Sequence, residues 1–543
     1  MRKNSKSYHW LNNLTIILSL VVLAGCASVQ SPTGGPKDVT PPKVVEESPR
    51  NLTRNFKSKR ITLEFNEFVR LNNESNEVAI SPALDQFPTF KAHKSTLDIT
   101  FEDTLEANTT YTINFGKAVG DVNENNILTN YTYVFSTGNT IDSLMITGNV
   151  QDALTKEKLK DVTVFILPAS QDSLFGKKRA SIFTTTDSAG NFRMSHLREN
   201  TYRIYALREP QGGDRIYNSR VEDIGFATDP VVLKDSTLNI PLQVFREVPE
   251  LLSITDRKIE NDGRMLFVFN REARLPGLQI IDPAALDGRK VTEFTARADS
   301  AFMWLPEMTF DSLKVALIEE NKPVDTVTLR RNKRDNYTRT ILLGDNLSNG
   351  RLRPATDLIL TASHPVSDFN PQAFTLLQDS VAVAGLQVTR MEGSQRKFVV
   401  RYPWRMNRNY ILTAGDNAFT EIGGTKSRKS EKTLTLDDPE NYGNLTLRVT
   451  RPDSAAYLIQ LLDQENNILK TDSVPTSGVI EYRTFPTSRY GIRVVYDRNR
   501  NGRWDTGSVK ERRQPEPVFN VEKQLTLRAN WDLEETITIP KLQ

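Results

Sequence analysis

Cysteine and histidine are the residue types that this sequence has least of. Among 543 residues there is one cysteine, Cys26, and there are four histidines. A single cysteine excludes an intramolecular disulfide and a zinc site built from cysteines. His93, His196 and His364 fall in three different predicted modules. A histidine-based metal site or catalytic triad would have to assemble between modules, so we interpret these residues as surface or core histidines.

An excess of one charge is also missing. The chain contains 70 Lys and Arg and 67 Asp and Glu, a formal net charge of +3. This balance argues against a nucleic-acid partner, since phosphate binding favours a clearly basic protein face. With 38% hydrophobic and 25% charged residues, the composition is ordinary for folded protein. The length exceeds one hydrophobic core and predicts about four or five domains.

The N-terminus has the pattern of an export signal. Arg2, Lys3 and Lys6 precede an apolar run over residues 14–23 that is shorter than the roughly 20 residues of a membrane-spanning helix. The run ends in Leu23-Ala24-Gly25-Cys26, which resembles the lipobox of bacterial lipoproteins. The resemblance implies a signal peptide over residues 1–25 and a lipid, including palmitate-type acyl chains, on Cys26, with anchoring to a membrane. The alternative is an ordinary signal peptide with a buried thiol.

Residues 26–39 are predicted to form a flexible tether, because they are rich in proline and contain Gly34-Gly35. Cleavage after residue 25 removes three basic and no acidic residues, so the mature chain has a formal net charge of zero. Neither Ala27 nor Ser28 is acidic. By resemblance to the lipoprotein sorting rule, this favours the outer membrane; whether the chain faces the periplasm or the cell surface stays open.

Helical periodicity is nearly absent from the rest of the chain. Short runs rich in Val, Ile, Thr, Tyr and Phe alternate with polar residues and end at Asn, Asp, Gly or Pro. This pattern is typical of half-buried antiparallel strands. The sequence therefore predicts an all-β fold, a string of antiparallel β-sandwich modules after the lipoprotein signal peptide.

The first predicted module spans residues 40–138, with strands over 61–65, 97–101, 110–115 and 131–135. It resembles the bacterial Ig-like domain first associated with surface-layer proteins. The residues that carry this resemblance are Thr40-Pro41-Pro42, Ser48-Pro49, Phe65, Glu67, Thr110-Tyr111 and Phe135-Ser136-Thr137-Gly138. The run Pro32-Thr33-Gly34-Gly35-Pro36-Lys37-Asp38 resembles a group of Bacteroidota lipoproteins that carry this domain.

The second module, residues 142–246, contains Thr186-Asp187-Ser188-Ala189-Gly190-Asn191-Phe192. It resembles the transthyretin-like, carboxypeptidase-regulatory-like β-sandwich, in which this stretch is a hairpin turn. Asp and Gly suit the turn, and Phe returns to the core. The last module, residues 443–541, repeats the pattern, with Tyr490 aligned to Tyr202, and predicts an internal duplication. Residues 250–330 and 350–437 are predicted as two further Ig-like β-sandwiches.

Signatures of enzymes are missing. There is no H-E-x-x-H and no G-x-S-x-G, and Gly423-Gly424-Thr425-Lys426-Ser427 lacks the spacing of a phosphate-binding loop. The sequence predicts that the chain is not an enzyme and that no cofactor is certain. One alternative stays open, a hydrolase with an unrecognised pair of carboxylates in residues 250–440.

One loop has the alternating oxygens of a calcium site. Asp497, Asn499, Asn501 and Asp505 could offer side-chain oxygens and Arg503 its carbonyl, with Gly502 at the sixth position. The twelfth position is Ser508, where a calcium loop needs a bidentate Glu, and three arginines repel a cation. The competing interpretation is a long turn closed by Asx hydrogen bonds, with Trp504 packed on the sandwich.

The hypothesis with most support is a non-catalytic lipoprotein of the cell envelope, anchored in a membrane by lipid. Its sandwiches would form a scaffold, an adhesion arm or a protein-binding arm for an envelope partner, although fold alone does not fix function. A glycan-binding accessory lipoprotein is the alternative from another class. It would need aromatic rings on one surface, and Trp304, Trp404, Trp504 and Trp531 are dispersed over the modules.

Overall fold

The computed structural model describes residues 37–542 except 83, 85, 103, 211, 212, 220, 235–237 and 333. The predicted signal peptide, Cys26 and most of the tether lie outside the described residues. Strands dominate the rest, so the all-β prediction is confirmed. The described helices are short, namely α2 (Glu74–Glu77) and the 3-10 turns η1 (Ala169–Leu174), η2 (Ala284–Arg289), η3 (Pro371–Ala373) and η4 (Pro439–Asn441). None of the described helices has the length and apolar character that crossing a bilayer requires.

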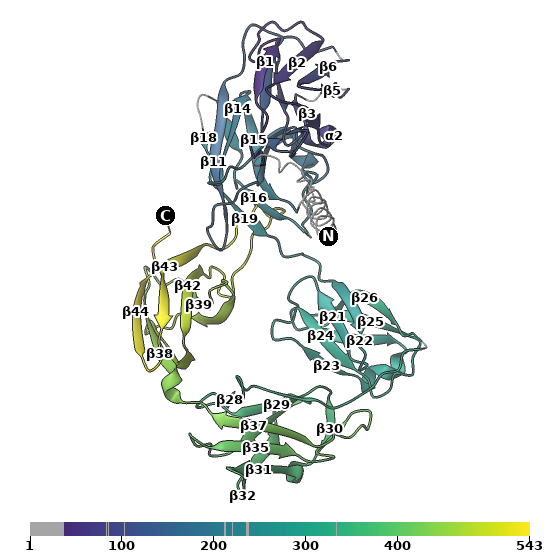
Figure 1. Cartoon of the computed structure of the whole chain (residues 1–543), viewed down its shortest axis with the longest axis vertical. Helices are drawn as coiled ribbons and strands as arrows, with labels where there is room; N and C mark the ends of the chain where they lie inside the picture. Colours follow the sequence, from purple (N-terminus) through teal and green to yellow (C-terminus); the bar gives the residue numbers. More distant parts are fainter. Residues whose placement is uncertain are drawn as a thin grey trace, which may run out of the picture. The chain divides into compact units, whose positions relative to one another are not determined.

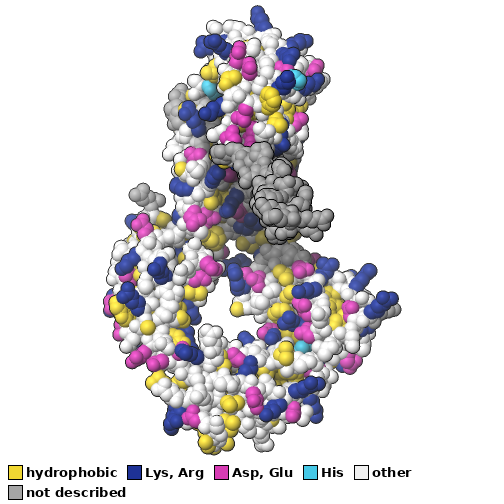
Figure 2. Space-filling view, in the orientation of Figure 1, with side chains coloured by type: hydrophobic (Ala, Val, Ile, Leu, Met, Phe, Trp, Pro, Cys, Tyr) yellow, Lys and Arg dark blue, Asp and Glu magenta, His cyan; other side chains and the backbone are white. Residues whose placement is uncertain are grey.

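The chain divides into two compact units, Met1–Asp142 and Ser143–Gln543. The first contains one β-sandwich and the second contains four, whose strands are drawn as arrows in Figure 1. Each of the five has its own core of buried apolar side chains. Basic and acidic side chains are interspersed over the face shown in Figure 2, in line with the even charge balance of the sequence.

The first sandwich follows from the alternation in its strands. In β2, Ile61, Leu63 and Phe65 are buried while the residues between them are exposed or half-buried. Its sheets have the orders β1-β2-β6-β5, β10-β7-β4 and β3-β8-β9. The strands are β1 (Val44–Ser48), β2 (Arg60–Phe65), β3 (Val69–Leu71), β4 (Ala79–Ser81), β5 (Thr89–His93), β6 (Thr96–Thr100), β7 (Thr110–Asn114), β8 (Val119–Asp121), β9 (Ile127–Leu128) and β10 (Thr132–Ser136).

In the second sandwich, β11 pairs antiparallel with β14 and parallel with β18 and β19, while β15 pairs with β12, β16 and β17. The predicted turn joins β13 to β14. The Asp187 side chain accepts from the N–H groups of Ala189 (2.9 Å) and Asn191 (2.8 Å), and Gly190 adopts φ +75°. The strands are β11 (Leu144–Asp152), β12 (Thr163–Pro168), β13 (Ile182–Thr185), β14 (Asn191–Leu197), β15 (Asn200–Arg208), β16 (Asp223–Phe226), β17 (Val231–Leu233), β18 (Leu238–Asn239) and β19 (Leu242–Arg246).

The third sandwich packs a sheet of order β20-β21-β24-β23 with one of order β22-β25-β26. Its strands are β20 (Ile254–Ile259), β21 (Met265–Phe269), β22 (Gly277–Asp282), β23 (Val291–Phe294), β24 (Ser300–Trp304), β25 (Ser312–Glu319) and β26 (Lys322–Arg330). Alternation again predicts the buried face, since β21 buries Met265, Phe267 and Phe269.

The fourth sandwich has sheets of order β27-β29-β34-β33 and β28-β37-β35-β31-β32, with a short pair β30-β36. Its first strand, β27, lies in the segment between the two predicted Ig-like modules. The strands are β27 (Leu343–Asp345), β28 (Arg351–Leu352), β29 (Leu358–Ala362), β30 (Val366–Phe369), β31 (Phe374–Gln378), β32 (Val381–Val383), β33 (Gln387–Arg390), β34 (Lys397–Arg401), β35 (Asn409–Ala414), β36 (Phe419–Glu421) and β37 (Ser430–Leu436).

The fifth sandwich repeats the strand pairing of the second. Here β38 pairs antiparallel with β41 and parallel with β44, as β11 does with β14 and β19, and β42 lies between β39 and β43. The strands are β38 (Tyr442–Thr450), β39 (Tyr457–Leu462), β40 (Ile468–Ser473), β41 (Val479–Pro486), β42 (Ser488–Tyr496), β43 (Val518–Leu527) and β44 (Asp532–Thr538). A duplication would produce this repeated pattern; the duplication itself remains a prediction.

Candidate functional site

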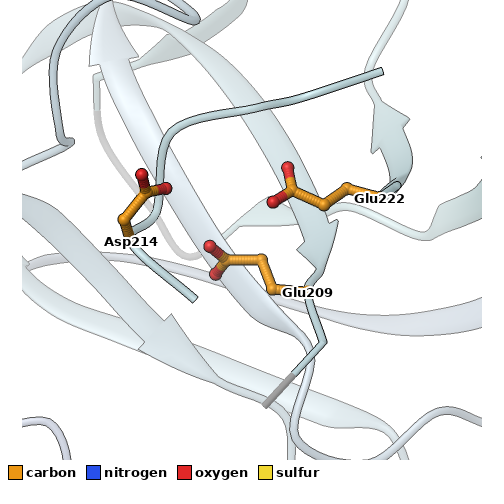
Figure 3. A group of neighbouring side chains, drawn as sticks. All are labelled: Glu209, Asp214 and Glu222. Atoms are coloured by element: carbon orange, nitrogen blue, oxygen red, sulfur yellow. The ribbon is translucent and has the colours of Figure 1, made fainter. Parts of the chain in front are cut away.

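Three carboxylates converge beside the second sandwich. Glu209 directly follows β15, Glu222 directly precedes β16, and Asp214 lies in the loop between these strands. One carboxylate oxygen from each residue lies within 4.8 Å of the others (Figure 3). Glu222 is buried, Glu209 is half-buried and Asp214 is exposed. Such a set could hold a hard cation through oxygen ligands.

The surroundings of this acidic cluster make its negative charge costly. Burial raises the pKa of Glu209, and the charges of Glu222 and Asp214 raise it further. Burial also raises the pKa of Glu222, with a contribution from Asp214. Main-chain N–H groups offset part of this cost, since Arg215 donates to Glu209 (2.7 Å) and Asn218 donates to Glu222 (2.6 Å). The carboxylates are therefore partly satisfied by the loop itself.

The predicted calcium loop connects β42 to β43 in the fifth sandwich. Its oxygens accept hydrogen bonds from within the loop. Asp497, which is 4% exposed, accepts from the N–H groups of Asn501 (3.0 Å) and Gly502 (3.0 Å). Asp505 accepts from the side-chain amides of Asn499 and Asn501, the latter at 2.7 Å.

Further Asx contacts complete the predicted calcium loop. Asn501 Oδ1 accepts from the Arg503 N–H (3.0 Å), and the Arg503 guanidinium lies 3.5 Å from Asp505. These bonds are those expected of the Asx-turn interpretation, and a calcium ion would have to replace them. Calcium binding here remains a prediction.

Glu516 was not among the residues singled out in the predicted calcium loop. It directly precedes the Pro517 that leads into β43, and it is 7% exposed. Its carboxylate accepts from the N–H groups of Arg498 (2.7 Å) and Asp505 (3.0 Å). Burial raises its pKa, as it does for Glu222, which stands at the same place before β16. The equivalence of the two residues follows from the pairing of β16 with β15 and of β43 with β42, which local sequence patterns do not reveal.

His364 and the tryptophans Trp304 and Trp404 take packing roles, whereas His93 is exposed. His364 is 2% exposed, and its Nε2 lies 3.3 Å from the Asp262 carbonyl oxygen of the neighbouring sandwich. Trp304 is 1% exposed and lies under the Arg396 guanidinium at 4.9 Å. Trp404 packs edge-on with Tyr410 at a ring distance of 5.0 Å.

Trp504 lies in an apolar cluster, and Trp531 is 52% exposed. The four tryptophans that the sequence suggested for a glycan surface thus do not share one exposed face. Glu421, a buried carboxylate in the region considered for a hydrolase, accepts from the N–H of Gly423 (2.8 Å) and is held by its own loop.

The fifth sandwich docks on the second, although hundreds of residues separate them. Gln514 donates to the Phe226 carbonyl (2.8 Å) and Asn520 to the Leu154 carbonyl (2.8 Å). Thr506 donates to the Arg246 carbonyl at 2.6 Å. Charged groups add to these bonds, because Arg512 pairs with Asp172 of the second sandwich, and Lys510 pairs with Glu250 in the segment between β19 and β20 (2.8 Å).

Apolar side chains seal the same interface. Leu458, Val495 and Val518 of the fifth sandwich form a cluster with Trp504 and with Leu154 of the second. Sequence patterns did not reveal this contact, because the loops that form it have no periodicity. We call the surface formed by these polar and apolar contacts the docking interface. The structure assigns the chain to the multi-domain β-sandwich proteins.

Comparison with known proteins supports one module directly. Residues 38–137 match the family model of a bacterial Ig-like domain, which confirms the prediction for the first sandwich. The sequence matches no curated protein.

Solved structures share little with the chain. BcpA, the major pilin subunit of Bacillus cereus, has 10% identity and a TM-score of 0.14 over 74% of this chain and 99% of its own. The Bacillus anthracis TIE protein has 9% identity and a TM-score of 0.14 over 99% and 79%. The S-layer protein rSbsC has 11% identity and a TM-score of 0.15 over 89% and 66%. At these TM-scores the likenesses carry no argument about function.

Proposed function

We propose that this protein is a lipid-anchored, non-catalytic scaffold of the bacterial cell envelope that presents β-sandwich surfaces to an envelope protein. Two features support the setting. The lipobox-like run ending in Cys26 supports lipid attachment, and the bacterial Ig-like domain at residues 38–137 is consistent with an envelope protein. The non-acidic Ala27 and Ser28 favour the outer membrane, and the proline-rich tether would hold the first domain away from the lipid.

The docking interface is the observation that carries the scaffold function. Sandwiches joined only by linkers would move independently. Here the last sandwich of the second unit is bonded to the first sandwich of that unit by main-chain, side-chain and apolar contacts. Closing the unit in this way restricts the movement of the sandwiches between its ends, and a restricted arrangement of binding surfaces suits a scaffold.

Capture of partners from the protein's own membrane tests this proposal. The lipidated chain is compared with a Cys26→Ser variant in which residues 1–25 are replaced by an ordinary cleavable signal peptide, so that the apolar run is removed in both. Both chains carry the same C-terminal tag and are recovered after mild crosslinking in cells. The proposal expects the unsubstituted chain in the membrane fraction together with a reproducible envelope protein, and the variant released from the membrane. Recovery of no envelope protein with the lipidated chain would contradict the scaffold function, and membrane retention of Cys26→Ser would contradict the anchor.

A further inference from the structure

A pocket opens between the second and fifth sandwiches, next to the docking interface. Its volume is about 410 Å³, within the range of pockets that hold small molecules. Both sandwiches contribute to its lining, so the pocket exists only when the two are docked. The second contributes Lys156, Phe226 and Pro241 among others, and the fifth contributes Arg498, Pro515 and Pro517.

Two of the residues that line the pocket are basic and none is acidic. Lys156 comes from the loop after β11 and Arg498 from the loop after β42, so the charges approach from opposite sandwiches. Lys156 donates to the neutral amide oxygen of Gln243 at 3.1 Å. Among the residues that the structure describes, neither side chain forms an ion pair with a carboxylate. A cation held without a counter-ion favours an anion in the same space.

A third cation strengthens the positive potential behind the pocket. Arg493 on β42 is 4% exposed, and its guanidinium donates to the neutral oxygens of Asn520 (3.2 Å) and Gln460 (3.3 Å). Its charge contributes to lowering the pKa of Lys156, although burial of the ammonium is the larger cause. The Asp152 carboxylate acts in the opposite direction and partly offsets the two cations, while its Oδ1 accepts from the Leu154 and Thr155 N–H groups at 2.8 Å each.

The remaining walls suit an apolar body with a few hydrogen bonds. Phe226, Pro241, Pro515 and Pro517 offer flat apolar surfaces. The walls are also held in place, because the Gln514 amide donates to the Phe226 carbonyl (2.8 Å) and to the Thr228 hydroxyl (3.3 Å). The proline rings further restrict the segment that carries them. A preorganised wall lowers the entropic cost of binding.

We propose that this pocket binds a small organic oxyanion, a carboxylate or phosphate carried on a partly apolar body, with Lys156 and Arg498 holding the charged group and Phe226 and the prolines holding the body. The two anions share this recognition chemistry, and the experiment below separates them. The proposal does not depend on the lipid anchor, so it can fail while the scaffold function stands, and the reverse also holds.

Three matched probes test the proposal on the whole mature chain with Cys26→Ser. Benzoate, phenyl phosphate and the neutral benzamide are each titrated while saturation-transfer NMR follows the ligand. We expect at least one anion to saturate with a dissociation constant of about 1 mM or tighter and benzamide to bind at least about tenfold more weakly. The anion that binds more tightly shows whether the pocket prefers a carboxylate or a phosphate.

Substitutions then locate the site. Arg498→Gln and Lys156→Gln should each weaken the preferred anion at least about tenfold, since each removes one charge-assisted contact. Lys156→Arg should retain binding. Arg500→Gln is the matched control, because this exposed arginine lies in the same loop and does not line the pocket. Equal thermal midpoints establish that each variant is folded.

Three results would overturn the proposal. They are equal binding of benzamide and benzoate, unchanged affinity in both Arg498→Gln and Lys156→Gln, and no binding of any probe at about 10 mM. A pH series gives an independent readout. An anion beside Lys156 favours its ammonium form, so affinity should fall as pH rises through the lysine's lowered pKa, and the fall should be absent in Lys156→Gln.

Discussion

The side-chain amide of Gln514 donates to the main-chain carbonyl of Phe226, 288 residues earlier in the chain, at 2.8 Å. Because the acceptor is a main-chain carbonyl, this hydrogen bond does not depend on which side chain residue 226 carries. It depends on the relative position of the two sandwiches. Together with the apolar cluster around Trp504, it turns the ends of a linear series of sandwiches into one closed unit.

Gly507 lies where the docking interface leaves no room for a side chain. A methyl group there would clash with the Phe245 ring and would lie 2.8 Å from the Arg513 carbonyl oxygen. Gly507→Ala should therefore lower the free energy of unfolding by about 1–3 kcal/mol. Gly288→Ala is the control, because nothing lies within 4 Å of its added methyl group. Chemical denaturation followed by tryptophan fluorescence checks the prediction, and equal stability of the two variants would contradict it.

Tyr202 and Tyr490 make the same bond in the two repeated sandwiches. Each hydroxyl donates to the carbonyl four residues upstream, Arg198 at 2.9 Å and Pro486 at 2.5 Å. Removing either hydroxyl by Tyr→Phe should destabilise the chain by about 1 kcal/mol, because the rings are buried. Tyr337→Phe, at an exposed hydroxyl, should change the melting temperature little. A loss at one tyrosine and none at the other would contradict equivalent roles.

The acidic cluster predicts a pH effect whose sign follows from burial. Burial raises the pKa of Glu222 in the folded chain above its ordinary value, so ionisation opposes folding. The contribution of the protonated Glu222 to stability is complete below the pKa of an ordinary glutamate, and it is lost as pH rises through the raised pKa of Glu222 in the folded chain. Glu222→Gln should remove this loss. The free energy of unfolding of the variant, measured relative to that of the unsubstituted chain, should therefore increase from pH 5 to pH 7. Glu199→Gln, on an exposed side chain, serves as the control, and identical pH profiles of Glu222→Gln and the unsubstituted chain would count against the buried charge.

The calcium prediction for residues 497–505 can be tested through Trp504. Its indole N–H donates to the Glu516 carbonyl (2.9 Å), and the adjacent Asp505 would be a calcium ligand. Calcium binding should change Trp504 fluorescence in the millimolar range and release the Asn501–Asp505 bond. The change should vanish in Asp505→Asn. If the unsubstituted chain does not respond to millimolar calcium, calcium binding is contradicted and the Asx-turn interpretation stands.

Local patterns predicted the strands well because alternation has a direct physical cause. Ile61, Leu63 and Phe65 fall on one face of β2 and are buried, and Asp187 with Gly190 forms the hairpin turn that their chemistry requires. The closure was not predictable in this way. Thr506 and Arg246 are 260 residues apart and meet through loops, where no repeating pattern marks a buried face.

The candidate sites show the same division. Asp497 and its neighbours were recognised from their spacing within nine residues. Glu222 and Glu516 could not be recognised from local spacing, because each lies at the far end of a loop. The pairing of β15 with β16 and of β42 with β43 places them beside the residues at the start of the loop. The pocket could not be predicted from local sequence patterns, because Lys156 and Arg498 belong to different sandwiches.

A distance measurement across the docking interface shows whether the second and fifth sandwiches are docked in solution. In the Cys26→Ser chain, which then lacks cysteine, nitroxide labels are placed at two exposed positions by Lys160→Cys on the second sandwich and Gln524→Cys on the fifth. Double electron–electron resonance should give one narrow distance distribution, and it should broaden when Gly507→Ala is added. A broad distribution already present in the doubly labelled chain with Gly507 intact would show that the two sandwiches are not docked and would contradict the account.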